Sequence, residues 1–410
     1  MYINKCRNCS YKKFTDLISL GNLSFSGIFA KKITKNIPKA EISLILCNKC
    51  KLVQLKNKFN KKFLYGKNYG YRTGINKTMT DHVYSIVKKV ERLSKINKRN
   101  LVLDIGSNDG TLLNFYKKDL IRVGIDPIIN KYKKFYSSID YKLADFFSQK
   151  SIDKLKLKKK FKIITALSMF YDLDSPNKFL IDIKKNLDKE GILILEHADL
   201  MCIVKNNLFD TICHEHVNYY SSKIIINMLR QNRLKLFDME YNLINGGSCR
   251  YYICHKDCNK FTNKKNENKI AKFILRENKF KLELKTTYVN FLKRINIIKN
   301  STISLIKNII EKKKEIHGYG ASTKGNILLQ YFGINNLHIR YIADRNPKKN
   351  NHFTPGTKIK IITEKLSRKL KPDYYFVLPW HFKNEILERE YRIINSGTKF
   401  IFPLPRLTIQ

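Results

Sequence analysis

The sequence predicts an α/β fold built on a doubly wound parallel sheet. Between residues 80 and 255, short apolar runs alternate with stretches whose apolar residues recur at helical spacing, the pattern of strands and helices in such sheets. One run passes through a tight glycine turn into a helical stretch near residue 106, and a second such unit begins at residue 316. The 410 residues are therefore expected to hold a central domain and a smaller α/β domain near the C-terminus.

The turn after residues 101–105 is the centre of the chain. Residues 101–113 read LVLDIGSNDGTLL, and a helical pattern resumes over 111–118. A strand, a glycine turn and a helix start let backbone N–H groups approach a ligand closely. The spacing D-x-G-x-x-x-G differs from the G-x-G-x-x-G of dinucleotide-binding enzymes, and Asp104 and Asp109 would repel a pyrophosphate. They suit an ammonium group and a ribose, which fits S-adenosylmethionine (SAM). The residues of this turn expected to bind SAM are Asp104, Gly106, Asn108 and Gly110.

Polar residues follow the next strands of the predicted sheet. The run 121–125 ends at Asp126, about 20 positions past the glycine turn, where such folds bind a ribose diol. Asp145 follows a third short strand and either bonds an adenine amine or caps a helix, and Ser168 follows the strand 161–167. Ligands of these sheets sit at the carboxyl ends of strands, so we expect Asp126, Asp145 and Ser168 to bind SAM. Helices are predicted over 80–96, 176–187 and 221–232, and a fifth strand over 191–195.

A hairpin completes the predicted central sheet. Strands over 234–241 and 248–255 flank Asn245-Gly246-Gly247, a strong turn signal. An antiparallel hairpin at the end of a parallel sheet is the known finish of class I methyltransferase folds. The predicted parts are a zinc-binding lobe (1–75), a SAM-binding core (76–258), a lysine-rich helical linker (259–314) and a Rossmann-like domain (315–410).

The C-terminal unit has its own glycine turn. Residues 316–326 read IHGYGASTKGN, and a later strand ends at Asp344. Gly318, Gly320 and Asp344 resemble a dinucleotide fingerprint, but Thr323 stands at the third glycine position. The residues 322–324 at the helix start can instead hold an anionic group, and a purely structural turn is the third alternative.

Four of the nine cysteines form two C-x-x-C pairs. Cys6 and Cys9 precede Cys47 and Cys50, and four thiolates at this spacing predict a closed tetrahedral zinc site with a structural role. A redox pair needs a single C-x-x-C at a helix start, and a nucleic-acid zinc knuckle is a further alternative. The other five cysteines show no disulfide framework, the first residues do not form a signal peptide, and no apolar run spans a bilayer. We therefore expect a cytoplasmic protein without a membrane partner.

The formal net charge of +46 first suggests a nucleic-acid partner. However, the lysines are dispersed and are enriched together with Asn and Ile throughout the chain, as an AT-rich genome would produce. The sequence shows no arginine-rich arm and no stacking motif. We expect no specific nucleic-acid partner, and a basic surface that favours an anionic, nucleotide-linked substrate.

Two further segments carry candidate chemistry. Residues 209–221 read FDTICHEHVNYYS, where His214, Glu215 and His216 stand together. This cluster lacks the H-E-x-x-H spacing of a helical metal site and favours acid/base chemistry, because a neighbouring carboxylate tunes a histidine near neutral pH. Residues 63–82 are rich in glycine and tyrosine. This segment either covers the cofactor, or its Tyr65, Tyr69 and Tyr71 are ordinary core or surface tyrosines.

In their order, these segments resemble the sugar C-methyltransferases that act on nucleotide-linked 4-keto-6-deoxyhexoses. The resemblance covers nearly the whole chain. Its segments are the four-cysteine lobe ending CNKCKLVQL, then NYGYRTG, VLDIGSNDGTLL, SMFYDLD, FDTICHEHVNYYS, NGGSCR, GYGASTKGN and LPWHF.

The resemblance implies a three-part enzyme that uses SAM to methylate C3 of the sugar, next to the C4 ketone. It implies His216 as the base that removes the C3 proton, with Glu215 and His214 in support. It also implies that Tyr71, or as second choice Tyr69, corresponds to the family's tyrosine in the N-terminal segment. Some members carry a tyrosine where this chain has Cys213, and a thiol cannot replace a phenol hydrogen bond. We expect a monomer. The rival interpretations are an O- or N-methyltransferase, a nucleic-acid-binding zinc protein and an NAD-dependent enzyme.

Overall fold

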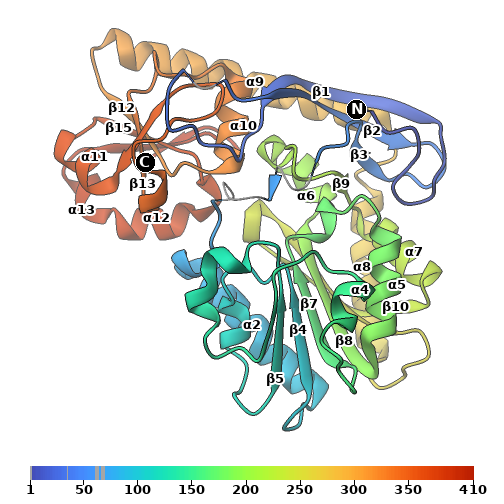
Figure 1. The fold of residues 1–410 in the computed structure, drawn as a ribbon. Coiled ribbons are helices and arrows are strands. Elements are labelled where there is room, and N and C mark those ends of the chain that lie inside the picture. The colour runs from blue at the N-terminus through green and yellow to red at the C-terminus, as the bar shows by residue number, and fades with distance from the viewer. Residues whose placement is uncertain (1, 35, 61–63, 66–69) are drawn as a thin grey trace.

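The computed structural model describes residues 1–410 except 1, 35, 61–63 and 66–69. A central domain carries the largest sheet, and an N-terminal lobe and a C-terminal domain lie on the same side of it (Figure 1). No helix in the described part of the chain is long and apolar enough to cross a membrane.

The central sheet has seven strands in the order β10-β11-β8-β7-β4-β5-β6. All neighbouring pairs are parallel except those that β11 makes. The strands are β4 (Leu101–Ile105), β5 (Ile121–Ile125), β6 (Tyr141–Leu143), β7 (Phe161–Leu167), β8 (Leu187–Ala198), β10 (Leu234–Asn242) and β11 (Ser248–His255). Counted in chain order within the domain, this is 3-2-1-4-5-7-6. The predicted doubly wound sheet with an antiparallel terminal hairpin is confirmed.

Helices cover both faces of this sheet. They are α2 (Lys77–Ser94), α3 (Thr111–Asn114), α4 (Gln149–Asp153), α5 (Pro176–Asn186) and α7 (Ser222–Gln231). The short helix α6 (Leu200–Lys205) lies beyond the strand ends and packs in the cluster shared with the N-terminal lobe and the C-terminal domain. Met79, Val83, Ile86 and Val90 form the buried face of α2, at the spacing of an amphipathic helix. The helix predicted over 111–118 ends at Asn114, since the chain turns there to bury Tyr116 and Leu120 in the core.

The N-terminal lobe is an antiparallel sheet of β1 (Phe14–Ser24), β2 (Lys39–Cys47) and β3 (Val53–Leu55). Its fourth strand, β9 (Asn218–Tyr219), comes from the central domain. Val53 pairs with Tyr219 and Gln54 with Asn218. The lobe is therefore joined by backbone hydrogen bonds to the strand that follows the His-Glu-His segment.

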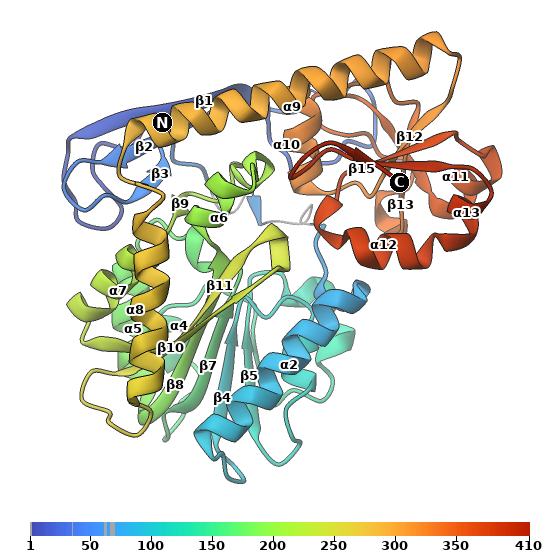
Figure 2. The same ribbon diagram turned by 180° about the vertical axis from the view of Figure 1, so that it is seen from behind.

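The segment 259–314 forms α8 (Lys264–Asn278) and α9 (Lys285–Glu311). Tyr288, Phe291 and Ile295 of α9 are fully buried in the cluster that also holds residues of β1 and of the C-terminal domain. Figure 2 shows α9 running from the N-terminal lobe to the C-terminal domain. The predicted linker is helical, but its second helix is a core element rather than a solvated connection.

The C-terminal domain has a sheet in the order β14-β13-β12-β15-β16-β17. Its strands are β12 (Ile316–Tyr319), β13 (Tyr341–Asp344), β14 (Lys360–Thr363), β15 (Tyr374–Val377), β16 (Lys399–Phe402) and β17 (Thr408–Ile409). The pairs are parallel except for β16 with β17. The helices are α10 (Thr323–Phe332), α11 (Glu364–Leu370), α12 (Lys383–Arg389) and α13 (Tyr391–Asn395). This is the predicted Rossmann-like arrangement.

Candidate active site

The glycine turn after β4 presents two buried carboxyl groups. Asp104 accepts a hydrogen bond of 2.6 Å from the Thr165 hydroxyl, and burial raises its pKa to about 7. Asp126 accepts backbone hydrogen bonds from Asn108 and Ile128, each at 2.9 Å, and burial raises its pKa to about 6. Burial disfavours the ionised form of a carboxyl group, and a nearby cation stabilises that form. These groups therefore fit a ligand that carries an ammonium and a sulfonium charge.

Glycine is required in this turn. Gly106 and Gly110 have φ angles of +72° and +74°, in the region that residues with a Cβ atom rarely adopt. A Cβ atom on Gly110 would also lie 2.9 Å from the Ile139 side chain. The N–H groups of this turn bond within the protein: those of Gly106 and Ser107 donate to the Ile125 carbonyl, and that of Asn108 donates to Asp126.

Residues 71–74 lie over this turn. The Thr73 N–H donates to Asn108 Oδ1 at 2.9 Å, and the Gly74 N–H donates to Asp109 Oδ2 at 3.1 Å. Arg72 forms an ion pair with Asp109 at 2.9 Å, so the charge of Asp109 is neutralised inside the protein. Asp104 and Asp126 stay the predicted carboxyl ligands at this turn. Tyr69 lies outside the described residues.

Asp145 and Ser168 lie at strand ends of the same sheet edge. Asp145 accepts a hydrogen bond from the Phe146 N–H at 2.8 Å and pairs with Lys154 at 3.0 Å. The Lys154 hydrogen bond is the main cause of its lowered pKa. Ser168 has a φ of +53°, and its N–H donates to the Glu196 carbonyl at 2.7 Å. Their roles in SAM binding stay predictions.

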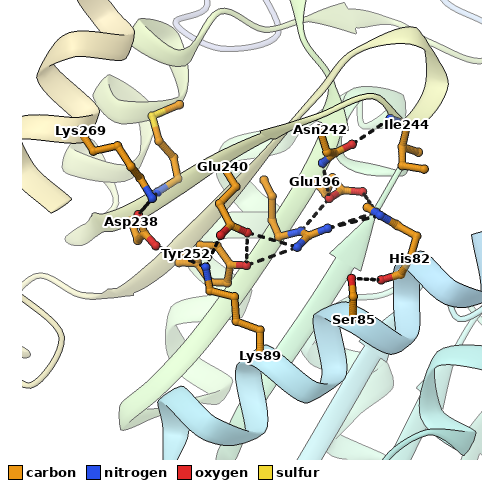
Figure 3. A network of polar contacts seen from close by, with 12 residues as sticks. His82, Ser85, Lys89, Glu196, Asp238, Glu240, Asn242, Ile244, Tyr252 and Lys269 are labelled. Atoms are coloured by element: carbon orange, nitrogen blue, oxygen red, sulfur yellow. Dashed lines mark hydrogen bonds and ion pairs between the residues drawn. The ribbon is translucent and has the colours of Figure 1, made fainter.

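A buried ion network lies beside this edge of the sheet (Figure 3). The Glu196 carboxylate, 2% exposed, accepts hydrogen bonds from Arg250 Nε at 2.7 Å and from Asn242 at 2.9 Å. Its other oxygen lies 2.5 Å from His82 Nε2. Burial raises the pKa of Glu196, but His82 and Arg250 outweigh that effect and hold it below its ordinary value. The network joins α2 to the hairpin β10–β11.

His216 is held in one orientation by its own loop. Its Nδ1 lies 2.8 Å from the carbonyl oxygen of Thr211, so the neutral ring carries its proton on Nδ1 and a lone pair on Nε2. Burial lowers the pKa of His216 to about 3, with a smaller effect from Lys324. The Tyr171 ring packs against it at a centroid distance of 4.2 Å. A neutral imidazole with a free Nε2 is a proton acceptor.

Glu215 and His214 face the N-terminal lobe. The Ser26 hydroxyl lies 3.5 Å from a Glu215 oxygen, and burial raises the pKa of Glu215. A Cβ atom on Gly27 would approach Glu215 Oε1 to 2.8 Å. His214 donates from Nε2 to the Ala40 carbonyl at 3.4 Å and packs on the Phe25 ring with centroids 4.5 Å apart. The His214 side chain therefore serves the contact between lobe and loop.

The C-terminal domain also contributes residues next to the loop of His216. Lys324, at the start of α10, donates to the Asn245 carbonyl at 3.2 Å, and burial lowers its pKa. Trp380 Nε1 donates to Asp210 at 2.8 Å, which ties this domain to the loop of His216. Burial, with Lys324, lowers the pKa of His381 well below its usual range. The SMFYDLD and LPWHF segments contain Tyr171, Trp380 and His381, which were not predicted from the sequence as site residues.

Asp344 lies at the C-terminal glycine turn. Its two oxygens accept hydrogen bonds from the Ala321 N–H and the Asn346 N–H, both at 2.7 Å. Asp126 accepts two backbone hydrogen bonds in the same way, so these bonds do not decide between a ribose contact and a structural turn, and the alternatives for this turn stay open.

Tyr71 and Cys213 are placed differently with respect to water. Tyr71 is exposed as a whole residue, and partial desolvation of its hydroxyl raises its pKa to about 12. Burial also raises the pKa of Cys213 well above its usual value, so the thiol stays protonated. Tyr71 and the Cys213 thiol are both neutral near pH 7.

The four predicted metal ligands lie together in the N-terminal lobe. The sulfur atoms of Cys6, Cys9, Cys47 and Cys50 are all within 4.8 Å of one another. Cys6 Sγ is 3.6 Å from Cys50 Sγ, and Cys9 Sγ is 3.5 Å from Cys47 Sγ. Sulfurs of a tetrahedral site with bonds of about 2.3 Å lie roughly 3.8 Å apart, so this cluster could hold a metal ion.

Known proteins match along the length of the chain. A family model described as "Methyltransferase domain" matches residues 79–237, and one described as "C-methyltransferase C-terminal domain" matches 243–405. C-methyltransferase NovU from Streptomyces niveus is 24% identical over 408 residues, which cover 98% of this chain and 96% of that protein. The chain is a SAM-dependent C-methyltransferase. The enzyme thus carries the glycine turn in the first matched region and Lys324 in the second.

Two solved methyltransferase structures each match less than half of the chain. A SAM-dependent methyltransferase from Clostridium acetobutylicum is 14% identical, covering 43% of the enzyme and 90% of that chain, with a TM-score of 0.34. Magnesium protoporphyrin IX methyltransferase from Synechocystis is 13% identical, covering 48% and 92%, also with a TM-score of 0.34. The fold assignment rests on the strand order of the enzyme itself.

Proposed function

We propose that the enzyme methylates C3 of a nucleotide-linked 4-keto-6-deoxy sugar through an enolate. The observation that carries this proposal is His216, a neutral imidazole whose Nδ1 is committed to Thr211. Its Nε2 lone pair can remove a proton that is acidic because it lies next to a ketone. The segments shared with sugar C-methyltransferases favour this substrate class.

SAM supplies an electrophilic methyl group on a positively charged sulfur, so the transfer needs no metal. His216 takes the C3 proton and leaves the electron pair in the enolate, whose C3 then forms the bond to the methyl group. The sulfur keeps the electrons of the broken bond, and the products are the C3-methylated sugar, S-adenosylhomocysteine and one proton. The protein provides alignment and proton handling.

Lys324 is proposed to stabilise the enolate oxygen. Its ammonium lies in a buried setting between Asp210 and the loop of His216, where a fixed positive charge acts strongly on developing negative charge. Burial is the main cause of the lowered pKa of His216, and the same cation lowers that pKa further in the free enzyme. An anionic substrate beside Lys324 offsets that cation and so raises the pKa of His216 when it is needed as a base.

Glu215, His214 and Tyr71 are assigned supporting roles. Glu215 precedes the base and contacts the lobe at Ser26, so it positions the loop and can take up a proton. His214 anchors the loop to the lobe. Because Cys213 is a protonated, buried thiol, Tyr71 is the phenol we assign to hydrogen-bond the sugar.

We also propose zinc at the four-cysteine cluster, with a structural role. Four thiolates complete a tetrahedral shell and leave no open position for a substrate. Gln54 Nε2 lies 3.3 Å from Cys6 Sγ, and Gln54 pairs with Asn218 of β9. The metal site therefore supports the strand that follows His216.

Purified enzyme, SAM and a panel of nucleotide-linked 4-keto-6-deoxy sugars test the proposal by mass spectrometry and NMR. A mass gain of one methyl group with the new carbon on C3 is expected. A methyl group on oxygen or nitrogen would instead support the rival O- or N-methyltransferase interpretation and refute the enolate route.

A further inference from the structure

Three lysines gather where the C-terminal domain meets the central domain. Lys131 belongs to η2 (Ile129–Tyr136), and Lys348 and Lys349 belong to η6 (Pro347–Lys349). Lys131 Nζ and Lys348 Nζ lie 5.8 and 5.9 Å from the centroid of the same Tyr132 ring. Lys349 Nζ donates to the Ala321 carbonyl at 2.5 Å. The two domains thus bring three ammonium groups to one place.

These positive charges repel one another. Burial lowers the pKa of Lys131, and the neighbouring Lys348 and Lys349 lower it further. The carboxylate beside Lys349 is Asp344, at 3.6 Å, and it already accepts the two backbone hydrogen bonds of its turn. An anion between the two domains would turn this repulsion into attraction.

The lysine cluster lies near the candidate active site along the chain. Lys349 contacts Ala321, and three residues later Lys324 contacts Asn245 and lowers the pKa of His216. Three residues span at most about 10 Å. The Tyr132 hydroxyl, next to Lys131, donates to the Tyr71 carbonyl at 3.1 Å. An elongated ligand can therefore reach from the lysines to His216.

We propose that Lys131, Lys348 and Lys349 bind the diphosphate of the nucleotide-linked substrate across the interface of the central and C-terminal domains. This rests on the proposed function. Lysine suits the role because an ammonium group, unlike a planar guanidinium, meets the oxygens of a diphosphate without a fixed plane. Binding from both domains holds the sugar end of the substrate beside His216 and Lys324.

Inorganic pyrophosphate is the probe, and its binding to the full-length enzyme is measured by calorimetry. Each of Lys131→Gln and Lys348→Gln is expected to weaken binding about tenfold. Lys133→Gln is the matched control. Lys133 is exposed on η2, the helix that also holds Lys131, and the substitution removes the same charge. An equal loss of affinity in all three variants would mean that the net charge of the protein, not a specific site, determines pyrophosphate binding. That result would refute the proposed site.

Steady-state kinetics separate this inference from the proposed function. The two cluster variants should raise KM for the nucleotide sugar about tenfold, while the Kd for SAM stays unchanged. Methylation with unaltered KM in both variants would overturn the diphosphate site and leave the proposed function standing. Pyrophosphate binding that depends on Lys131 and Lys348, without methylation of any keto sugar, would support the anion site and refute the proposed function.

Discussion

Glu196→Gln removes the central charge of the buried network while keeping its shape. Glu196 and Arg250 are 2% and 7% exposed at their side chains, and losing one partner of a buried ion pair costs about 3–5 kcal/mol. The amide retains some hydrogen bonds, and Glu240 still lies 3.3 Å from Arg250, so we expect about 3 kcal/mol. This corresponds to a fall of roughly 6–12 °C in the Tm of the central domain.

Glu240→Gln is the matched control for this prediction. The Glu240 side chain is 32% exposed, so its removal should cost about 0–1 kcal/mol. Thermal unfolding followed by circular dichroism, with SAM absent, gives both values. The Glu196 pKa is held below its ordinary 4.5, so its stabilisation is fully present above that value and is lost as the pH falls through the lowered folded pKa. Equal, small effects of the two substitutions at neutral pH would refute the reasoning.

Three further predictions concern the site. SAM binding, measured by calorimetry, should tighten as pH rises towards the Asp104 pKa of about 7, because the ionised carboxylate attracts the ligand's cations; Asp104→Asn should flatten this dependence. Gly27→Ala should lower kcat with little change in the Kd for SAM, because its Cβ atom displaces Glu215; an unchanged kcat would contradict the role of Glu215. Metal removal by a chelator should disturb β3–β9 and increase hydrogen exchange at Tyr219 and at Leu55, whose N–H donates to the Val217 carbonyl; unchanged exchange at both would contradict the coupling.

The parallel sheet of the central domain, its terminal hairpin and the second α/β domain could be predicted from local signals, whereas the strand orders came from the structure. Every residue of β4 is buried, and all of them except Asp104 are apolar. The glycine turns mark the ends of such strands. The four-cysteine cluster followed from ligand spacing alone. The helix after the glycine turn was predicted too long, because the burial of Tyr116 and Leu120 is a tertiary effect that helical spacing does not reveal.

The composite site could be predicted only in part. His216 and Glu215 stand together in the sequence, but Lys324 is more than 100 positions away and reaches the same loop through the packing of the C-terminal domain. The pairing of Gln54 with Asn218 and the ion pair of Arg72 with Asp109 likewise join distant segments. Such contacts depend on how the domains pack, which no local pattern encodes.

The most direct test of the central claim is deuterium exchange at C3 of the keto sugar in heavy water without SAM. The account predicts that the wild-type enzyme exchanges this proton, because His216 removes it before the methyl group is transferred. His216→Asn should abolish the exchange while the Kd for SAM stays unchanged. Exchange at the wild-type rate in His216→Asn would contradict the assignment of the base, and methylation at C3 without any exchange by the wild-type enzyme would contradict a freely reversible enolate step.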